Sequence, residues 1–148
     1  MRGIVFLACA AAIAAALAGD AVAHRVESSR RWGFRAAGVD SLAVENESGN
    51  ITVERWDRDS IDVEASVRVK APAASTARRL RDAVSFRVEE RRGAVAIRAE
   101  TPRTRQTAFG FGGGEFTAIR IRYRIRAPER IVLRLATGNG RIEGPSNK

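Results

Sequence analysis

The chain has 148 residues, a formal net charge of +9, one cysteine and one histidine. This length allows one modest domain, a single cysteine cannot form an internal disulfide framework, and a single histidine argues against a histidine-based metal site. Arginine supplies almost all of the positive charge, because Lys70 and Lys148 are the only lysines. The composition therefore predicts a small basic protein that depends on an apolar core rather than on disulfides.

The N-terminal segment has the order of a secretory signal peptide, with a positive start, an apolar run and a small-residue cleavage site. Arg2 precedes an uncharged run at residues 4–18, and Ala21-Val22-Ala23 follows it. As a helix, this run would reach only about 22 Å, short of the ~30 Å hydrocarbon core of a bilayer, so a retained membrane anchor is the less favoured alternative. We expect cleavage after Ala23 or after Ala18, export to the periplasm or the cell surface, and no transmembrane span in the mature chain.

Residues 24–40 follow the expected cleavage site and show no sustained hydropathy period. They predict a polar leader, in which Trp32 and Phe34 cover the edge of a core. From residue 41 to residue 148 the period becomes two, which predicts a β-domain. The expected organisation is therefore a signal peptide at residues 1–23, the polar leader, and one β-domain.

The clearest strand of the β-domain is expected at residues 61–70. One face carries Ile61, Val63, Ala65, Val67 and Val69, and the other carries Asp62, Glu64, Ser66, Arg68 and Lys70. This alternation is typical of a half-buried antiparallel strand. Further strands are expected at residues 41–45, 51–56, 84–90, 94–100, 116–127 and 130–136, with a hairpin turn at Arg91-Arg92-Gly93.

A helix is expected at residues 73–83, directly after Pro72 ends the preceding strand. The segment contains strong helix formers and no glycine, and its apolar residues recur at helical spacing. Ser75 or Thr76 would cap the start of this helix. We interpret the segment as one short helix that lies against a sheet.

A strand, a glycine-asparagine turn and a second strand occur twice in the sequence, at residues 42–51 and 133–142. Repeated short strands with such corners favour a rolled or solenoid-like sheet, although a general preference of hairpins for these residues is an equally weighted alternative. A last strand that starts at Arg141 would expose its edge, so we expect a continuation beyond residue 148 or a partner edge that covers it. The predicted fold is all-β, a rolled or β-solenoid-like antiparallel sheet with one short helix, truncated at its C-terminal end.

The order of these elements resembles a known bacterial family. Residues 41–56 read SLAVENESGNITVERW, and a turn at Asp57-Arg58-Asp59 and a long strand follow; later come YRIRAP at residues 123–128 and a TGNG turn at residues 137–140. This pattern is similar to the putative-adhesin β-domain family of unknown function, which is found in exported bacterial proteins. The resemblance covers about residues 41–144. It implies an all-β, solenoid-like domain at the cell envelope with no known catalytic residues.

The strongest local feature is a row of arginines on one face of an expected strand, namely Arg120, Arg122, Arg124 and Arg126. Successive members lie about 6.6 Å apart along such a strand, so they repel one another and favour an anionic partner. Asp62 and Glu64 on a neighbouring strand are internal candidates. Outside the chain, lipopolysaccharide phosphate, acidic polysaccharide and nucleic acid all suit planar guanidinium groups. A solvated face, partly neutralised within the protein, is the more favoured reading of this row.

Nucleic acid is not expected as a partner, because the expected export would remove the chain from the cytosol and few aromatic residues interleave the arginines. The glycine-rich segment at residues 110–114 lacks the Gly-Lys-Ser/Thr sequence of a phosphate-binding loop and predicts a hairpin tip. Asp57 and Asp59 are a weak candidate for a calcium site. We therefore expect no metal and no cofactor.

Catalysis finds little support, because His24 lies at the expected mature terminus and no cysteine would remain after cleavage. The favoured function is an exported, non-enzymatic domain of the cell envelope with a structural or adhesin-like role in surface recognition. The alternative is a periplasmic module that binds anionic glycans or lipid headgroups through the four arginines. An envelope protein is a further possible class of partner.

Overall fold

The computed structural model describes residues 23–103 and 117–145, which form nine strands and one helix. The expected signal peptide, apart from Ala23, and the glycine-rich segment at residues 110–114 lie outside the described residues. In chain order the elements are β1 (His24–Arg35), β2 (Ser41–Ser48), β3 (Ile51–Arg55), β4 (Ser60–Ala71), α1 (Ala74–Ala83), β5 (Ser85–Arg91), β6 (Ala94–Glu100), β7 (Ala118–Ala127), β8 (Val132–Asn139) and β9 (Ile142–Glu143).

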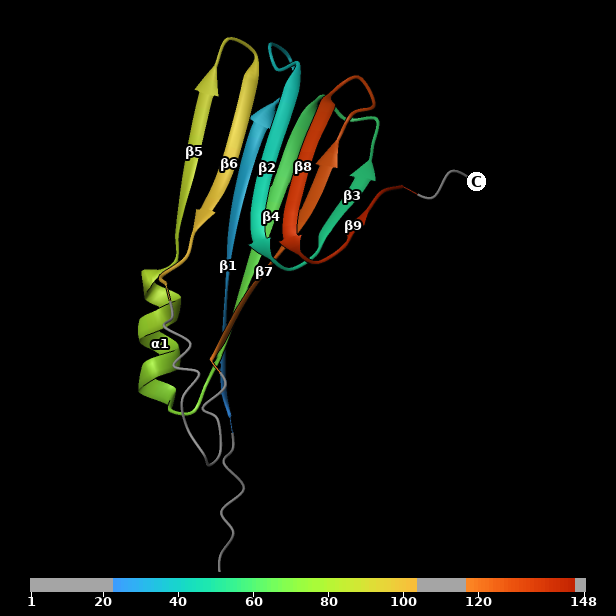
Figure 1. The fold of residues 1–148 in the computed structure, drawn as a ribbon. Coiled ribbons are helices and arrows are strands. Elements are labelled where there is room, and N and C mark those ends of the chain that lie inside the picture. Colours follow the sequence, from blue (N-terminus) through green and yellow to red (C-terminus); the bar gives the residue numbers. More distant parts are fainter. Residues whose placement is uncertain (1–22, 104–116, 146–148) are drawn as a thin grey trace, which may run out of the picture.

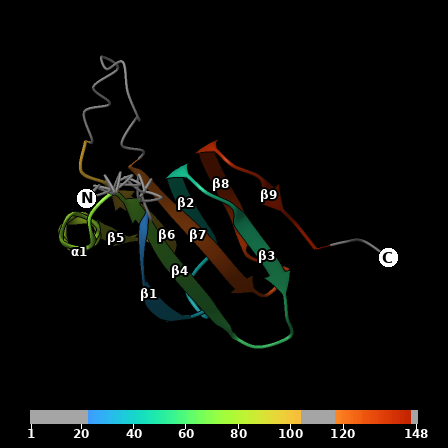
Figure 2. The same ribbon diagram turned by 90° about the horizontal axis from the view of Figure 1, so that it is seen from below.

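The strands form two sheets with the apolar core between them. Sheet A has five strands in the order β1-β4-β7-β3-β9, and sheet B has four in the order β5-β6-β2-β8. Figure 1 and Figure 2 show the two layers, with α1 beside the lower part of sheet A, where it contacts β1 and β4. Both sheets contribute fully buried side chains, among them Leu42, Ile51, Ile61, Ile97, Ile121, Tyr123 and Ile125. The predicted all-β fold with one short helix is confirmed.

The expected antiparallel arrangement is correct for only part of the molecule. β4 runs antiparallel to both of its neighbours, β1 and β7, and β5 runs antiparallel to β6. In contrast, β2 runs parallel to β6 and β8, and β3 runs parallel to β7 and β9. An alternating sequence indicates that one face of a strand is buried, but it carries no information about the direction of the neighbouring strands. The sheets are therefore mixed.

The structure differs from the expected polar leader, because His24–Arg35 forms strand β1 and pairs with β4 along its whole length. Trp32 and Phe34 pack against the core at its edge. Ser28 and Arg30 lie on the same face but are exposed. β1 is an edge strand, and the core covers its inner face only in part. Polar residues therefore interrupt the apolar period, and hydropathy alone does not identify the strand.

β4 and α1 follow their sequence patterns, with one correction at the helix cap. All five apolar side chains expected to share a face of β4 are buried. α1 buries Ala77 against the sheet, but its N-cap residue is Ala73, which has an extended backbone and makes no side-chain cap hydrogen bond. The expected cap is therefore wrong, because the extended backbone at Ala73 places Ser75 and Thr76 inside the first turn of the helix.

The hairpin turn expected at residues 91–93 joins β5 to β6. Arg92 and Gly93 form its two-residue loop with φ values of +41° and +80°. Tight two-residue hairpin loops favour positive φ at both central positions, because this backbone twist matches the twist of the strands. The predicted hairpin is confirmed.

The two copies of the sequence repeat stack on each other in register. β8 lies parallel to β2 and β9 lies parallel to β3, and paired residues are 91 positions apart throughout. The turns stack as well: the Gly49 N–H donates to the Asn139 carbonyl at 2.8 Å, and the Ile51 N–H donates to the Arg141 carbonyl at 2.9 Å. A Cβ atom on Gly140 would lie 2.0 Å from the Gly49 carbonyl oxygen, so the contact requires glycine.

This stacking shows that the repeat is a structural unit rather than two unrelated hairpins. It also leaves the second copy uncovered: Ile51 is fully buried, whereas its partner Ile142 is 46% exposed. A solenoid with further copies stays a prediction, because the described residues contain two.

Candidate functional site

The four arginines of β7 lie on the outer face of sheet A. Arg120, Arg122 and Arg124 are exposed and Arg126 is partly buried, whereas Ile121, Tyr123 and Ile125 between them face the core. The registers of β1, β4, β7 and β3 extend this face into a grid of side chains. The grid divides into two regions of different charge.

The first region, here called the paired half, consists of Arg31, Glu54, Asp62, Glu64, Arg124 and Arg126. Glu54 on β3 binds two arginines at once, with Oε1 2.6 Å from Nη2 of Arg124 and Oε2 3.1 Å from Nε of Arg126. Asp62 accepts two hydrogen bonds from the Arg31 guanidinium at 3.1 and 3.0 Å. Three arginines and three carboxylates thus balance in this region.

These contacts perturb the ionisation of one group. The hydrogen bond from Arg124 and the positive charges of Arg124 and Arg126 hold the pKa of Glu54 below its ordinary value of 4.5, against a smaller opposing effect of desolvation. The side chains of Glu54 and Arg124 are 42% and 50% exposed, so water screens the pair strongly. Glu54 therefore stays ionised at neutral pH and neutralises its part of the arginine row.

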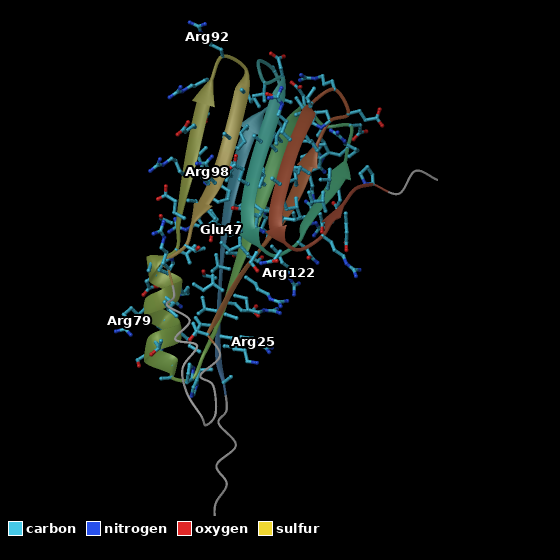
Figure 3. The ribbon with its side chains drawn as sticks, viewed as in Figure 1. Arg25, Glu47, Arg79, Arg92, Arg98 and Arg122 are labelled. Atoms are coloured by element: carbon cyan, nitrogen blue, oxygen red, sulfur yellow. The ribbon has the colours of Figure 1, made fainter. Side chains whose placement is uncertain are left out.

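The second region, here called the basic half, consists of five cationic side chains and one carboxylate: Arg25, Arg68, Lys70, Arg120, Arg122 and Glu27. Arg68 on β4 lies directly opposite Arg120 on β7. Like charges at such positions destabilise a sheet unless an anion intervenes. Figure 3 labels Arg25 and Arg122 in the lower part of the molecule, along the long strands of sheet A. The net charge of this region is strongly positive.

Glu27 is the one internal anion of the basic half, and it binds Arg68 with Oε1 2.6 Å from Nε. Within residues 23–103 and 117–145, no carboxylate lies within 4.0 Å of the guanidinium of Arg120 or Arg122. These two arginines therefore differ from Arg124 and Arg126, which lie on the same face of the same strand. An anion from outside the chain would be electrostatically favourable beside them.

A cleft of about 280 Å³ opens in the basic half. Arg68, Arg120, Arg122, Glu27, Ser66 and the Gly49-Asn50 turn line it. β3 begins only at Ile51, which pairs with Tyr123, so the earlier part of β7 has no strand neighbour on that side. The turn before β3 forms a wall there instead of a strand, which creates the hollow.

Asn46 holds this turn in place. Its side-chain N–H groups donate to the carbonyl of Gly49 at 3.2 Å and to the carbonyl of Ile121 at 2.7 Å. The Tyr123 N–H also donates to the Asn50 carbonyl at 2.9 Å. Gly49 itself has φ +128°, and a Cβ at this position would lie 2.0 Å from the Ile121 carbonyl oxygen. The wall of the cleft is therefore fixed by hydrogen bonds and by close backbone contact.

The structure places Asp62 and Glu64 as expected, opposite Arg126 and Arg124 on the neighbouring strand. Sequence reasoning missed Glu54, which makes the shorter contacts with both arginines. Arg68 could have been found, because the alternation of β4 puts it on the polar face. Glu27 could not, because β1 was not recognised as a strand.

The weak calcium candidate gains no support from the described geometry. Asp59 binds Arg130 at 2.7 Å, and residues 23–103 and 117–145 hold no group of three or more His, Cys, Asp or Glu side chains that could bind a metal ion. In the same part of the chain, no helix combines the length and apolar character needed to cross a membrane.

No family model matches the chain, and neither does any curated protein. A solved structure of a "putative cell adhesion protein" from Clostridium sporogenes is similar at 9% identity and a TM-score of 0.44, over 80% of this chain and 51% of that chain. A "putative adhesin" from Parabacteroides merdae is similar at 11% identity and a TM-score of 0.41, over 80% of this chain and 38% of that one. A "putative adhesin" from Parabacteroides distasonis is similar at 14% identity and a TM-score of 0.34, over 79% of this chain and 40% of that one. The chain thus spans about half the length of these proteins or less, and its function has to follow from its own surface chemistry.

Proposed function

We propose that this chain is an exported, non-enzymatic surface-recognition domain, adhesin-like in role, which binds an anionic polymer of the cell envelope through its basic half. The observation that supports this proposal is the division of charge on one continuous face. The paired half satisfies its arginines internally, whereas the basic half leaves Arg120 and Arg122 without a carboxylate partner among the described residues.

The basic half suits a ligand with several negative charges. Neighbouring cationic side chains lie about 6.6 Å apart along a strand and about 5 Å apart across strands. Guanidinium groups form short, paired hydrogen bonds with phosphate, sulfate and carboxylate oxygens. A ligand with repeated charges at similar spacing neutralises several of these side chains together. Acidic polysaccharides and anionic lipid headgroups both offer this chemistry.

The test compares two double variants that remove the same charge from the same strand. Retention on immobilised heparin, a sulfated polysaccharide, is measured as a function of salt for the unmodified chain, for Arg120→Ser with Arg122→Ser, and for Arg124→Ser with Arg126→Ser. A charge-assisted hydrogen bond contributes about 1.5 kcal/mol or more, so loss of Arg120 and Arg122 should weaken binding by roughly 100-fold at low salt. The control pair should change binding by less than about 3-fold, because Glu54 and Asp62 already pair with these two arginines.

Two outcomes would contradict the proposal. Equal losses in the two double variants would show that only the total charge of the chain matters. No retention of the unmodified chain at low salt would favour a purely structural role for this face. Steep weakening with salt is expected, because polyanion binding releases counterions.

A further inference from the structure

A carboxylate inside the basic half already occupies one of its arginines. Glu27 lies directly opposite Arg68 in the β1–β4 register, and the two side chains form an ion pair with Oε1 2.6 Å from Nε. The side chains of Arg68 and Glu27 are 41% and 57% exposed. β1 is the outermost strand of sheet A, so no further strand confines Glu27 on its outer side. This carboxylate can therefore leave Arg68 without disturbing the core.

We propose that Glu27 is an internal competitor for the ligand, and that the ligand is a phosphorylated or sulfated saccharide. In the free protein the carboxylate of Glu27 binds Arg68. One phosphate or sulfate group of the saccharide displaces it and binds Arg68, Arg120 and Arg122 together in the cleft. This inference rests on the function proposed above, since it names the ligand of the same surface.

The competitor favours a phosphate or sulfate group over a carboxylate. A ligand carboxylate that replaces Glu27 on Arg68 exchanges one such contact for another of the same kind. A phosphate or sulfate group offers three outward oxygens, which is enough for three guanidinium groups at once. A phosphate or sulfate group can therefore bind Arg68, Arg120 and Arg122 with one oxygen each, whereas a carboxylate has two oxygens and, like Glu54, pairs with two arginines.

The shape of the cleft favours a saccharide over a lipid surface. Its volume of about 280 Å³ is close to the lower limit for small-molecule sites, which suits one charged sugar unit. Ser66 and Asn50 line it and can bind sugar hydroxyl groups. Because the Asn50 Oδ1 already accepts a hydrogen bond from the Arg141 N–H at 3.1 Å, the side-chain NH2 of Asn50 is the group that would donate to a sugar hydroxyl. Among the described residues, the exposed large hydrophobic side chains are Val132 and Ile142 on β8 and β9. Within residues 23–103 and 117–145, the basic half thus carries no exposed large apolar side chain that could insert into a bilayer.

The test compares two variants that each remove one negative charge from the outer face of sheet A. Glu27→Gln removes the competitor, and Glu64→Gln is the matched control in the paired half, opposite Arg31 and Arg124. Affinity for a size-defined, sulfated heparin oligosaccharide is measured by titration calorimetry at two salt concentrations. An exposed ion pair stabilises by up to about 1 kcal/mol, so Glu27→Gln should tighten binding about 5-fold, and Glu64→Gln by less than about 2-fold.

The outcomes separate this inference from the function on which it rests. No binding of the unmodified chain to the oligosaccharide would overturn the proposed function itself. Binding that depends on Arg120 and Arg122 but changes equally in Glu27→Gln and Glu64→Gln would overturn only the role of Glu27.

Two further probes test the class of ligand. Equal affinity of the unmodified chain for a polyuronate of the same charge density would overturn the preference for phosphate or sulfate. Tighter binding to vesicles of anionic phospholipid than to the oligosaccharide would overturn the assignment to a saccharide. The inference as a whole would be supported if the unmodified chain binds the polyuronate and the vesicles more weakly than the oligosaccharide, and if Glu27→Gln raises the affinity for the oligosaccharide about 5-fold.

Discussion

Arg120 and Arg122 differ from Arg124 and Arg126 only in what lies beside them. All four side chains lie on the same face of the same strand, β7. The second pair contacts Glu54 and Asp62, whereas the first pair has no carboxylate within 4.0 Å among the described residues. A row of identical residues on one strand can therefore contain both a neutralised surface and a basic surface that has no carboxylate partner for Arg120 and Arg122 among the described residues.

The difference between the two halves follows from where β3 begins. β3 pairs with β7 from Tyr123 to Ala127, so Glu54 can reach Arg124 and Arg126. Before Tyr123, the neighbour of β7 on that side is the Gly49-Asn50 turn, which supplies no acidic side chain. The end of one short strand thus decides which arginines stay available.

The largest effect is expected for a substitution in the Gly49-Asn50 turn, which lies where the paired half meets the basic half. Gly49→Ala would place a Cβ 2.0 Å from the Ile121 carbonyl oxygen at φ +128°, and neither backbone can move away cheaply. We expect a loss of about 3 kcal/mol or more in the free energy of unfolding, measured by urea denaturation. Gly33→Ala on β1 is the control, since nothing lies within 4 Å of its Cβ, and it should change stability by less than about 1 kcal/mol. Similar losses in both variants would contradict this role of the turn.

The second-largest effect is expected for a double variant that removes the difference in charge between the paired half and the basic half. Glu54→Gln with Asp62→Asn frees Arg31, Arg124 and Arg126, so the whole face becomes basic. Heparin affinity should rise about 10-fold and its salt dependence should steepen, because more cationic groups contact the polymer.

The control for this gain changes the charge equally on sheet B. Glu45→Gln with Glu100→Gln removes two carboxylates that bind Arg98 and Arg87. If it raises the affinity as much as the first pair does, the gain reflects net charge and not the freed arginines.

The smallest effect is the pH dependence of the paired half. The hydrogen bond from Arg124 lowers the pKa of Glu54 in the folded protein below its ordinary 4.5. A lowered folded pKa stabilises the fold fully above the ordinary value, and this stabilisation is lost as the pH falls through the folded pKa. The difference in urea midpoint between the unmodified chain and Glu54→Gln should therefore be constant above pH ~6 and shrink toward pH ~3. A difference that grows on acidification would be inconsistent with the pairing.

Periodicity was sufficient to place most of the elements and the arginine row. The alternation in β4 and β7 identifies their buried and polar faces correctly, and the residues opposite Arg124 and Arg126 on β4 were anticipated. Strand direction was not accessible, because parallel and antiparallel strands can share the same alternation. The cleft was not accessible either, because it depends on β1 and on the point where β3 begins.

β1 illustrates why an edge strand escapes sequence analysis. Its inner face carries Trp32 and Phe34 near one end but Ser28 and Arg30 in the middle, where the core does not cover it. The strand is held by its hydrogen-bonded ladder with β4 rather than by a continuous apolar face. Hydropathy records burial, so it misses a strand that is stabilised mainly by pairing.

The separation of 91 residues between stacked partners has a consequence for how the chain folds. β2 and β3 are synthesised early, but one edge of each stays unpaired until β8 and β9 have followed. Closing so long a segment costs conformational entropy before any contact compensates for it, and folding rates fall as contacts become more distant in sequence. We therefore expect folding in milliseconds to seconds rather than microseconds. Until folding is complete, the open edges of β2 and β3 are exposed to wrong pairing.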